Sequence, residues 1–168
     1  MNRETIDLLF DYSRWANGRI LAATQGLSEE QYIAVVSGLS MGSVRGTLVH
    51  MLAAVHIWRQ RCLEGQSPTS LLSGDELPTF AVLRERWVEE EVAWRDGLAR
   101  LGDVSLRRHL AYRTTNGTPM EETLWKILVH LVNHGTQHRA EAAVALTAFG
   151  RSPGDVDLIV YLRQAAPG

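Results

Sequence analysis

The sequence predicts an all-α protein built as a four-helix bundle, and three features of the chain lead to that fold class. Four stretches repeat apolar residues at intervals of three and four, which is the spacing of one face of a helix. Capping residues or glycines mark several of their ends, and polar loops separate them. Amphipathic helices joined by loops bury their apolar faces against one another, here in an antiparallel or a crossover order.

The first predicted helix covers residues 2–25. Its apolar residues at helical spacing are Ile6, Leu9, Phe10, Ile20 and Leu21. Ser13 and Asn17 fall in the same inward stripe, so a polar pocket is expected to border this helix. A capping-box pattern at Ser28 and Gln31 predicts a short turn before a polar, glycine-rich connection.

The second predicted helix covers residues 43–64, and Gly65 is a suitable C-terminal stop. With about 100° of rotation per residue, His50 lies on the interior side of this helix. His56 falls on its polar face together with Arg59. The pattern therefore predicts an inward His50 and a surface His56.

A loop rich in Ser, Pro and Gly, residues 66–78, precedes a third predicted helix at residues 79–101. The apolar side of that helix is supplied by Leu83, Trp87, Trp94 and Leu98. Thirteen extended residues can span roughly 43 Å, whereas the second helix is only about 33 Å long. The loop can therefore return along the bundle and let the third helix run parallel to the second, although it does not require that path.

Residues 106–113 alternate apolar and polar side chains and lead to an Asn-Gly turn at residues 116–117, so a short irregular hairpin or an extended linker is expected. Residues 118–121 have a Thr cap, a Pro at the first position and a Glu at the third, which predicts a helix start. The fourth helix would then cover residues 118–149, and residues 155–164 a last short helix.

Histidines of the fourth helix provide the main functional signal. His130, His134 and His138 follow at four-residue steps, and the last two fall within the apolar seam of the helix. An unpartnered buried imidazole is costly, so these two are either core residues bonded to their neighbours or metal ligands. The inward His50 offers a third ligand. Three histidines with a position left open are typical of a catalytic metal site, and nitrogen donors suit Zn, Ni, Cu or Fe.

Gly135 distinguishes these histidines from the His-Glu-x-x-His motif of metalloproteases. A His-Glu-x-x-His metalloprotease motif needs a general base at that position, which argues against such an enzyme. Glycine within a helix costs up to about 1 kcal/mol. Either a neighbouring group or ligand approaches closely there, or two helices pack closely.

Composition excludes several classes of protein. The 168 residues are most simply one domain, 1–168, with 45% hydrophobic and 21% charged residues. A net charge of −2 without a basic block argues against nucleic acid or an anionic membrane as partner. No apolar run approaches a membrane span, and the first residues lack a signal-peptide pattern. The single Cys62 excludes an intrachain disulfide, so a cytoplasmic protein is expected.

The segment at residues 130–141, together with His50, resembles the signature of the DinB/YfiT-like superfamily of metal-dependent enzymes, and it reads HLVNHGTQHRAE. Other similarities are Tyr12, Trp15, Asn17, Trp58, Gly65 and Asp157. The resemblance implies an up-down-down-up bundle with a long crossover between the second and third helices, and homodimers. It implies that His50, His134 and His138 are the metal ligands, and it implies no DNA binding. The chain departs from many relatives at Val55, where they carry an acidic residue, and at residues 140–141, Ala-Glu instead of Gly-Gln.

Characterised relatives include transferases and an isomerase that use a low-molecular-weight thiol such as bacillithiol, mycothiol or glutathione. The resemblance therefore implies that a divalent metal (Zn, Ni or Fe) binds the thiol, lowers its pKa and presents a thiolate to an electrophilic small molecule. Candidates to line the pocket are Tyr12, Ser13, Asn17 and Arg139. Arg139 could pair with a carboxylate or bind an anionic group of the substrate, but a surface salt bridge is the expected alternative. Glu141 is either a carboxylate that orients an imidazole or a partly exposed surface acid.

Three other functions stay open on the sequence. The metal could activate water for hydrolysis instead of a thiol. The protein could bind a metal without turnover, as a sensing or stress-response module. The histidines could also be packed in a bundle that binds no metal.

Overall fold

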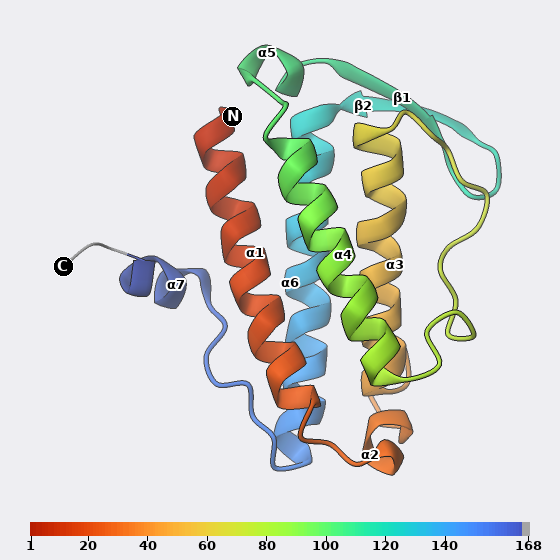
Figure 1. Cartoon of the computed structure of the whole chain (residues 1–168), viewed down its shortest axis with the longest axis vertical. Helices are drawn as coiled ribbons and strands as arrows, with labels where there is room; N and C mark the ends of the chain where they lie inside the picture. Colours follow the sequence, from red (N-terminus) through yellow and green to blue (C-terminus); the bar gives the residue numbers. More distant parts are fainter. Residues whose placement is uncertain (166–168) are drawn as a thin grey trace.

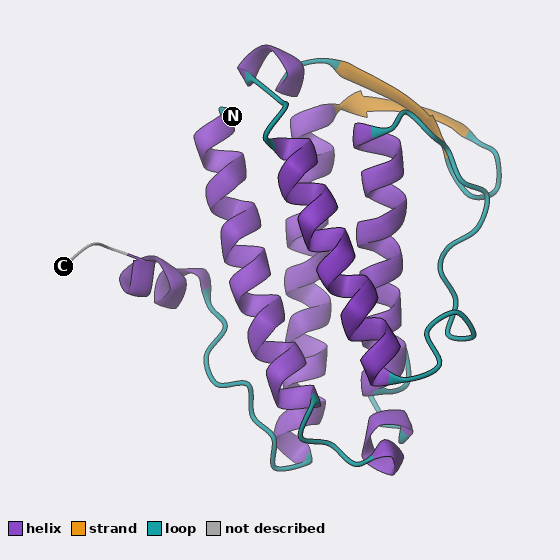
Figure 2. Ribbon diagram, in the orientation of Figure 1, coloured by secondary structure: helices purple, strands orange, loops and turns teal. Residues whose placement is uncertain are grey.

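The computed structural model describes residues 1–165, and most of these residues are helical, as predicted. Four long helices lie side by side (Figures 1 and 2). They are α1 (Arg3–Thr24), α3 (Val44–Leu63), α4 (Phe80–Leu98) and α6 (Leu124–Ala148). The shorter elements are α2 (Glu29–Ile33), α5 (Asp103–Leu106), β1 (His109–Arg113), β2 (Pro119–Thr123) and α7 (Leu158–Ala165).

The directions of the long helices can be followed in Figure 1, where α1 and α6 run downward and α3 and α4 run upward. The loop between α3 and α4 returns along the length of the bundle, so these two helices are parallel. Helix α6 packs most extensively against α1 and α3. It therefore turns one face to α1 and another to α3, and both faces carry polar side chains.

Local signals explain most helix boundaries. The side chains of Asn2, Ser43 and Thr79 each accept a hydrogen bond from the backbone N–H three residues later, which satisfies a free donor of the first turn. The capping box predicted at the start of α2 is present. Helix α4 ends at Leu98, three residues before the predicted end at 101. There Arg3 of α1 donates hydrogen bonds to the carbonyls of Leu98 and Leu101.

The predicted helix start at residues 118–121 is wrong. Residues Pro119–Thr123 form β2, which pairs in antiparallel register with β1 from Arg113 opposite Pro119 to His109 opposite Thr123. The turn between the strands uses Gly117 at a φ of +86°, a conformation that favours glycine. The backbone groups of this segment bond to β1, whereas in a capping box they would bond to side chains. The expected irregular hairpin is thus a regular one, and α6 begins at Leu124.

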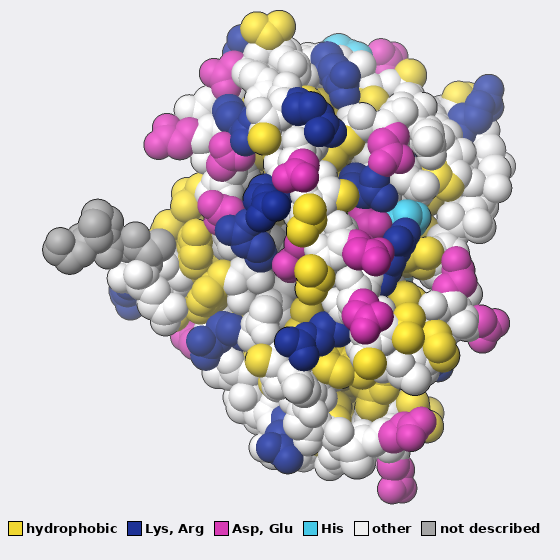
Figure 3. Space-filling view, viewed as in Figure 1, with side chains coloured by type: hydrophobic (Ala, Val, Ile, Leu, Met, Phe, Trp, Pro, Cys, Tyr) yellow, Lys and Arg dark blue, Asp and Glu magenta, His cyan; other side chains and the backbone are white. Residues whose placement is uncertain are grey.

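The apolar sides of the helices meet in two large buried clusters, one toward each end of the bundle. Trp87 and Trp94 of α4 are both buried, as their spacing predicted. On the face shown in Figure 3, basic and acidic side chains are interspersed over α1 and α4. Among the described residues, no helix combines the length and apolar character needed to cross a membrane.

Candidate metal centre

Three histidines converge between α3 and α6. His50 comes from α3, and His134 and His138 lie one turn apart on α6. One ring nitrogen from each lies within 4.8 Å of the others, and the Nε2 atoms of His50 and His134 are 3.0 Å apart. Nitrogens bound to one zinc ion at about 2.0–2.1 Å lie roughly 3.3 Å from each other. Small ring movements would therefore let all three bind one ion.

The surroundings keep the imidazoles of His50 and His134 unprotonated at neutral pH. Burial, reinforced by the neighbouring His138 and His50, lowers the pKa of His134 to about 4. Burial also lowers the pKa of His50, with a further contribution from His138. Both rings therefore present a nitrogen lone pair at neutral pH, which is the form that binds a metal.

His138 is the buried member of the group, and a carboxylate contacts its other nitrogen. Oε2 of Glu141 lies 3.4 Å from Nδ1 of His138 and accepts a hydrogen bond of 2.7 Å from the hydroxyl of Ser40. The Ser40 bond lowers the pKa of Glu141, and His138 adds to this effect, so the carboxyl group is ionised. Glu141 thus contacts the imidazole although its side chain is 21% exposed. Ser40, on the loop before α3, carried no sequence signal.

His130 lies outside the group of three. It is exposed, and its ring centroid is 5.9 Å from that of His134 and 5.9 Å from that of Trp58. Trp58 in turn stands edge to face with Tyr112 of β1, with centroids 5.1 Å apart. These side chains border a cavity of about 310 Å³, which His130 lines one turn of α6 before His134. Its lining is Trp58, Tyr112, Glu122, Lys126, Ile127 and His130.

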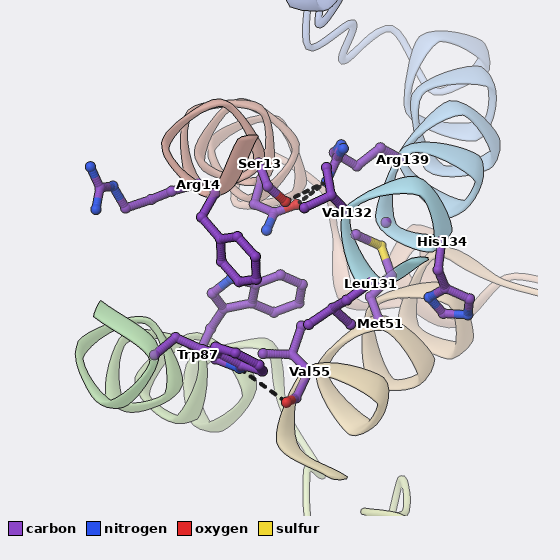
Figure 4. A pocket seen from close by; sticks show the side chains of 13 residues that line it. Ser13, Arg14, Met51, Val55, Trp87, Leu131, Val132, His134 and Arg139 are labelled. Carbon is purple, nitrogen blue, oxygen red and sulfur yellow. Dashed lines mark hydrogen bonds between the residues drawn. The ribbon is translucent and has the colours of Figure 1, made fainter. Parts of the chain in front are cut away.

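The side chains predicted to line the pocket divide between two cavities. Ser13, Asn17, Arg139 and His134 border an inner cavity of about 60 Å³, whose other walls are largely aromatic and aliphatic (Figure 4). In that view the ring of His134 points away from Ser13 and Arg139. The inner cavity has room for a few water molecules. Tyr12 does not line it and faces a second, outer cavity that it shares with Arg139.

The surface salt bridge expected for Arg139 is wrong, because this side chain is only 1% exposed. Its Nη1 donates hydrogen bonds of 3.0 Å to Ser13 and Asn17 on α1, and its Nη2 donates one of 2.8 Å to Thr136. A Cβ atom at Gly135 would lie 2.8 Å from Nη1 of Arg139. The glycine in the histidine motif therefore makes room for this guanidinium, one turn later on the same helix.

The prediction of a surface His56 is wrong as well. Its side chain is 14% exposed, and its Nδ1 lies 2.6 Å from Oε1 of Glu90, a buried residue of α4. Nε of Arg59 donates a hydrogen bond of 2.6 Å to the other carboxylate oxygen. A sequence signal existed, because Glu90 falls between Trp87 and Trp94 in the apolar stripe of α4. We call His56, Arg59 and Glu90 the charge cluster.

Comparisons with known proteins agree with the resemblance noted in the histidine segment. The model of the DinB family matches residues 1–168. Protein DinB of Bacillus subtilis (strain 168) is 26% identical over 164 residues, which cover 92% of this chain and 91% of that protein. The similarity thus extends over all four long helices, including both helices that carry the three histidines. The chain belongs to the DinB family.

Proposed function

We propose that this protein is a metal-dependent transferase in which His50, His134 and His138 hold one divalent transition metal, namely Zn, Ni or Fe. The proposed reaction joins a low-molecular-weight thiol, of the bacillithiol, mycothiol or glutathione type, to an electrophilic small molecule. One observation carries the proposal, the convergence of three imidazoles from two helices, of which His50 and His134 have lowered pKa values. Three protein donors leave a coordination position for a substrate. A metal bound there would lower the pKa of a coordinating thiol.

The side chains around the histidines support this role. The ionised carboxylate of Glu141 favours a proton on Nδ1 of His138, which leaves Nε2 of that ring free to bind. The cavity of about 310 Å³ lined by His130 offers a substrate both aromatic and charged contacts, from Trp58 and Tyr112 and from Lys126. We place the electrophile there rather than in the inner cavity, because the inner cavity is too small for it.

The proposal includes the finer features that the family resemblance implies. It takes residues 1–168 as a single domain whose four long helices form an up-down-down-up bundle, and it takes the protein to be a cytoplasmic homodimer. It assigns a small molecule as substrate and gives nucleic acid and membranes no part.

Metal content of the purified, untagged protein tests the site directly. We expect about one equivalent of transition metal per chain by plasma mass spectrometry in the wild type, and loss of that metal in His50→Ala and in His138→Ala. His56→Ala is the matched control, since it removes an imidazole from the same helix, six residues from His50, and should keep the metal. A wild type that is free of metal and also fails to bind added Zn and Ni would contradict the proposal.

Thiol consumption then separates the possible activities. The transferase is expected to consume a thiol and an electrophile together, only when the metal is bound. Turnover of an ester or amide without a thiol would instead identify a hydrolase, because the open position accepts water equally well. Tight metal binding with neither reaction would identify a binding module.

A further inference from the structure

The outer cavity, which none of the three histidines lines, is larger than both the inner cavity and the cavity lined by His130. It measures about 560 Å³ and lies between α1, α6 and the segment at residues 155–158. Most of its walls are apolar, formed by Leu9, Val129, Val132, Val156 and Leu158. The hydroxyl of Tyr12 donates a hydrogen bond of 3.0 Å to the carbonyl of Val156 and so holds the segment against the bundle. The cavity is thus bordered by three parts of the chain that are distant in sequence.

A buried cation without a counterion borders this cavity. Arg139 is 1% exposed, and no carboxylate of residues 1–165 lies within salt-bridge distance of it. Three of its five N–H groups donate to hydroxyl and amide oxygens, and the buried Nε–H has no acceptor in the described part of the chain. The ring of Tyr12 lies 5.3 Å from the guanidinium carbon and offsets part of the charge. A buried cation that lacks an anionic partner is still costly, and an anion that reaches it is favoured.

Arg139 lines both cavities, and its hydrogen-bond acceptors are divided between them. Nη1 is occupied by Ser13 and Asn17, which border the inner cavity. Nη2 donates to Thr136, which lines the outer cavity and not the inner one. Because Nε and Nη2 form one edge of the guanidinium plane, the remaining N–H groups are suited to the two oxygens of a carboxylate.

We propose that the outer cavity is a second small-molecule site, which binds a carboxylate with an apolar body and pairs its carboxylate with Arg139. The aliphatic walls contact the apolar body. None of the three histidines of the candidate metal centre lines this cavity, so the site does not depend on a bound metal.

Two acidic residues at the cavity decide which carboxylates fit best. Asp155 and Asp157 are exposed, and one oxygen of each accepts a backbone N–H, from Asp157 and Ile159 respectively. Water and salt screen these exposed charges, whereas Arg139 acts in a buried setting. Their negative charge would attract an ammonium group. A simple aliphatic acid and an apolar α-amino acid are therefore the two possible sources of the carboxylate.

Calorimetric titration of the metal-free protein tests the proposal with three ligands of one shape, which are 4-methylpentanoate, leucine and 4-methylpentanamide. We expect at least one of the two carboxylates to bind roughly tenfold or more tightly than the amide, because only a carboxylate pairs with the guanidinium. The tighter of the two identifies the source of the ligand. Failure of both carboxylates to bind at millimolar concentration, or equal binding of the amide, overturns the proposal.

Two variants test whether the ligand binds in the outer cavity. Arg139→Met should lose the preference for the carboxylate. Since Arg139 also ties α6 to α1, Ala140→Trp provides a second variant that fills the cavity and leaves the cation in place. Val144→Trp, one turn later on an exposed part of α6 outside the cavity, is its matched control and should bind as the wild type does.

Binding must also be separated from the metal centre, because carboxylates can bind metals. His50→Ala should bind the carboxylate with wild-type affinity. Loss of binding in His50→Ala would place the anion at the histidines and overturn the proposal, as would unchanged binding in Ala140→Trp. The proposed transferase activity is not needed for this test, so either idea can fail while the other stands.

Discussion

Two polar clusters that include residues of α3 differ in whether their members satisfy one another's hydrogen-bonding groups and charges. His50 faces α6 and meets two further imidazoles, while His56, on another face of the same helix, meets Glu90 of α4. In the charge cluster both oxygens of Glu90 accept hydrogen bonds of 2.6 Å, from His56 and from Arg59. In the histidine cluster three groups of one type meet instead: His50 and His134 can share one N–H between Nε2 atoms 3.0 Å apart, and neither ring contacts a carboxylate in the described part of the chain.

This difference separates a structural cluster from a binding cluster. Opposite charges that saturate each other stabilise the fold and leave nothing for a ligand, whereas like groups held together by the fold are arranged for something outside the chain. Burial alone would not make the distinction, because Glu90 is 2% exposed and His138 is 4% exposed. The comparison predicts that mutations in the charge cluster change stability, and that mutations in the histidine cluster change metal binding.

The largest expected effect is the loss of stability when the charge cluster is disrupted. Glu90→Ala leaves Arg59, whose side chain is 13% exposed, without its buried partner. Removal of one member of a buried pair should lower the free energy of unfolding by about 3 kcal/mol. Urea unfolding measures this change. Glu89→Ala, at the exposed neighbouring position, is the control and should stay within about 0.5 kcal/mol. Loss of bound metal in Glu90→Ala would contradict the separation of the two clusters.

Zinc should stabilise the protein only through the histidine cluster. At a concentration of 100 times the dissociation constant, a ligand that binds only the folded state adds about 2.7 kcal/mol to the free energy of unfolding. For a chain of this size we expect the unfolding midpoint in a thermal scan to rise by roughly 5–10 °C. His138→Ala should show no rise, and Glu90→Ala should show the full rise from a lower starting temperature. Equal responses of His138→Ala and the wild type would place the zinc elsewhere.

The same comparison explains what the sequence could predict. Periodicity located the inward His50, His134 and His138, because two ligands one turn apart on an apolar seam are visible within single helices. The surroundings of His56 and Arg139 were mispredicted, because their partners lie on other helices. A polar residue facing solvent and one facing a partner across the bundle produce the same local pattern.

Helix boundaries, too, are predicted correctly where the signal is local and wrongly where a distant segment takes part. The predicted helix starts near residues 2, 43 and 79 are confirmed, and each has a local capping side chain, from Asn2, Ser43 and Thr79. The equally good signal at residues 118–121 lost to backbone pairing with β1, which lies on the other side of the Asn-Gly turn. A sequence pattern identifies a capping residue, but it does not show whether another segment of the chain will pair with the same backbone groups.

A smaller effect, on metal affinity, is expected from Glu141, the carboxylate that contacts the histidine cluster. Glu141→Gln removes the charge beside Nδ1 of His138 and keeps the size of the side chain. Loss of such a partner typically weakens metal binding by roughly tenfold or more, equivalent to about 1.4 kcal/mol. Competition with a chromophoric chelator measures the affinity. Ser40→Ala should act in the same direction and more weakly, since Ser40 reaches the histidine only through Glu141. An unchanged affinity in Glu141→Gln would make this carboxylate a surface acid.

Acid should affect the two clusters in different pH ranges. His134 is a base whose folded pKa is lowered to about 4 by burial and by the neighbouring His138 and His50. As pH falls through about 6.5, the unfolded chain gains a proton that the folded chain does not, so stability decreases until about pH 4. Burial raises the pKa of Glu90, but hydrogen bonds from Arg59 and His56 outweigh it, so the folded pKa is lowered. Its contribution is complete above about pH 4.3 and is lost below.

Urea unfolding of the metal-free protein between pH 7 and pH 3 distinguishes the two ranges. His134→Gln should reduce the decrease in stability between about pH 6.5 and pH 4, whereas Glu90→Gln should leave that part unchanged and reduce the decrease below about pH 4.3. The reverse assignment would mean that the charge cluster, not the histidine cluster, responds near neutral pH. With saturating zinc the decrease assigned to His134 should still begin at about pH 6.5 but become larger and extend to lower pH, because the metal keeps the folded imidazole unprotonated while the unfolded chain gains its proton.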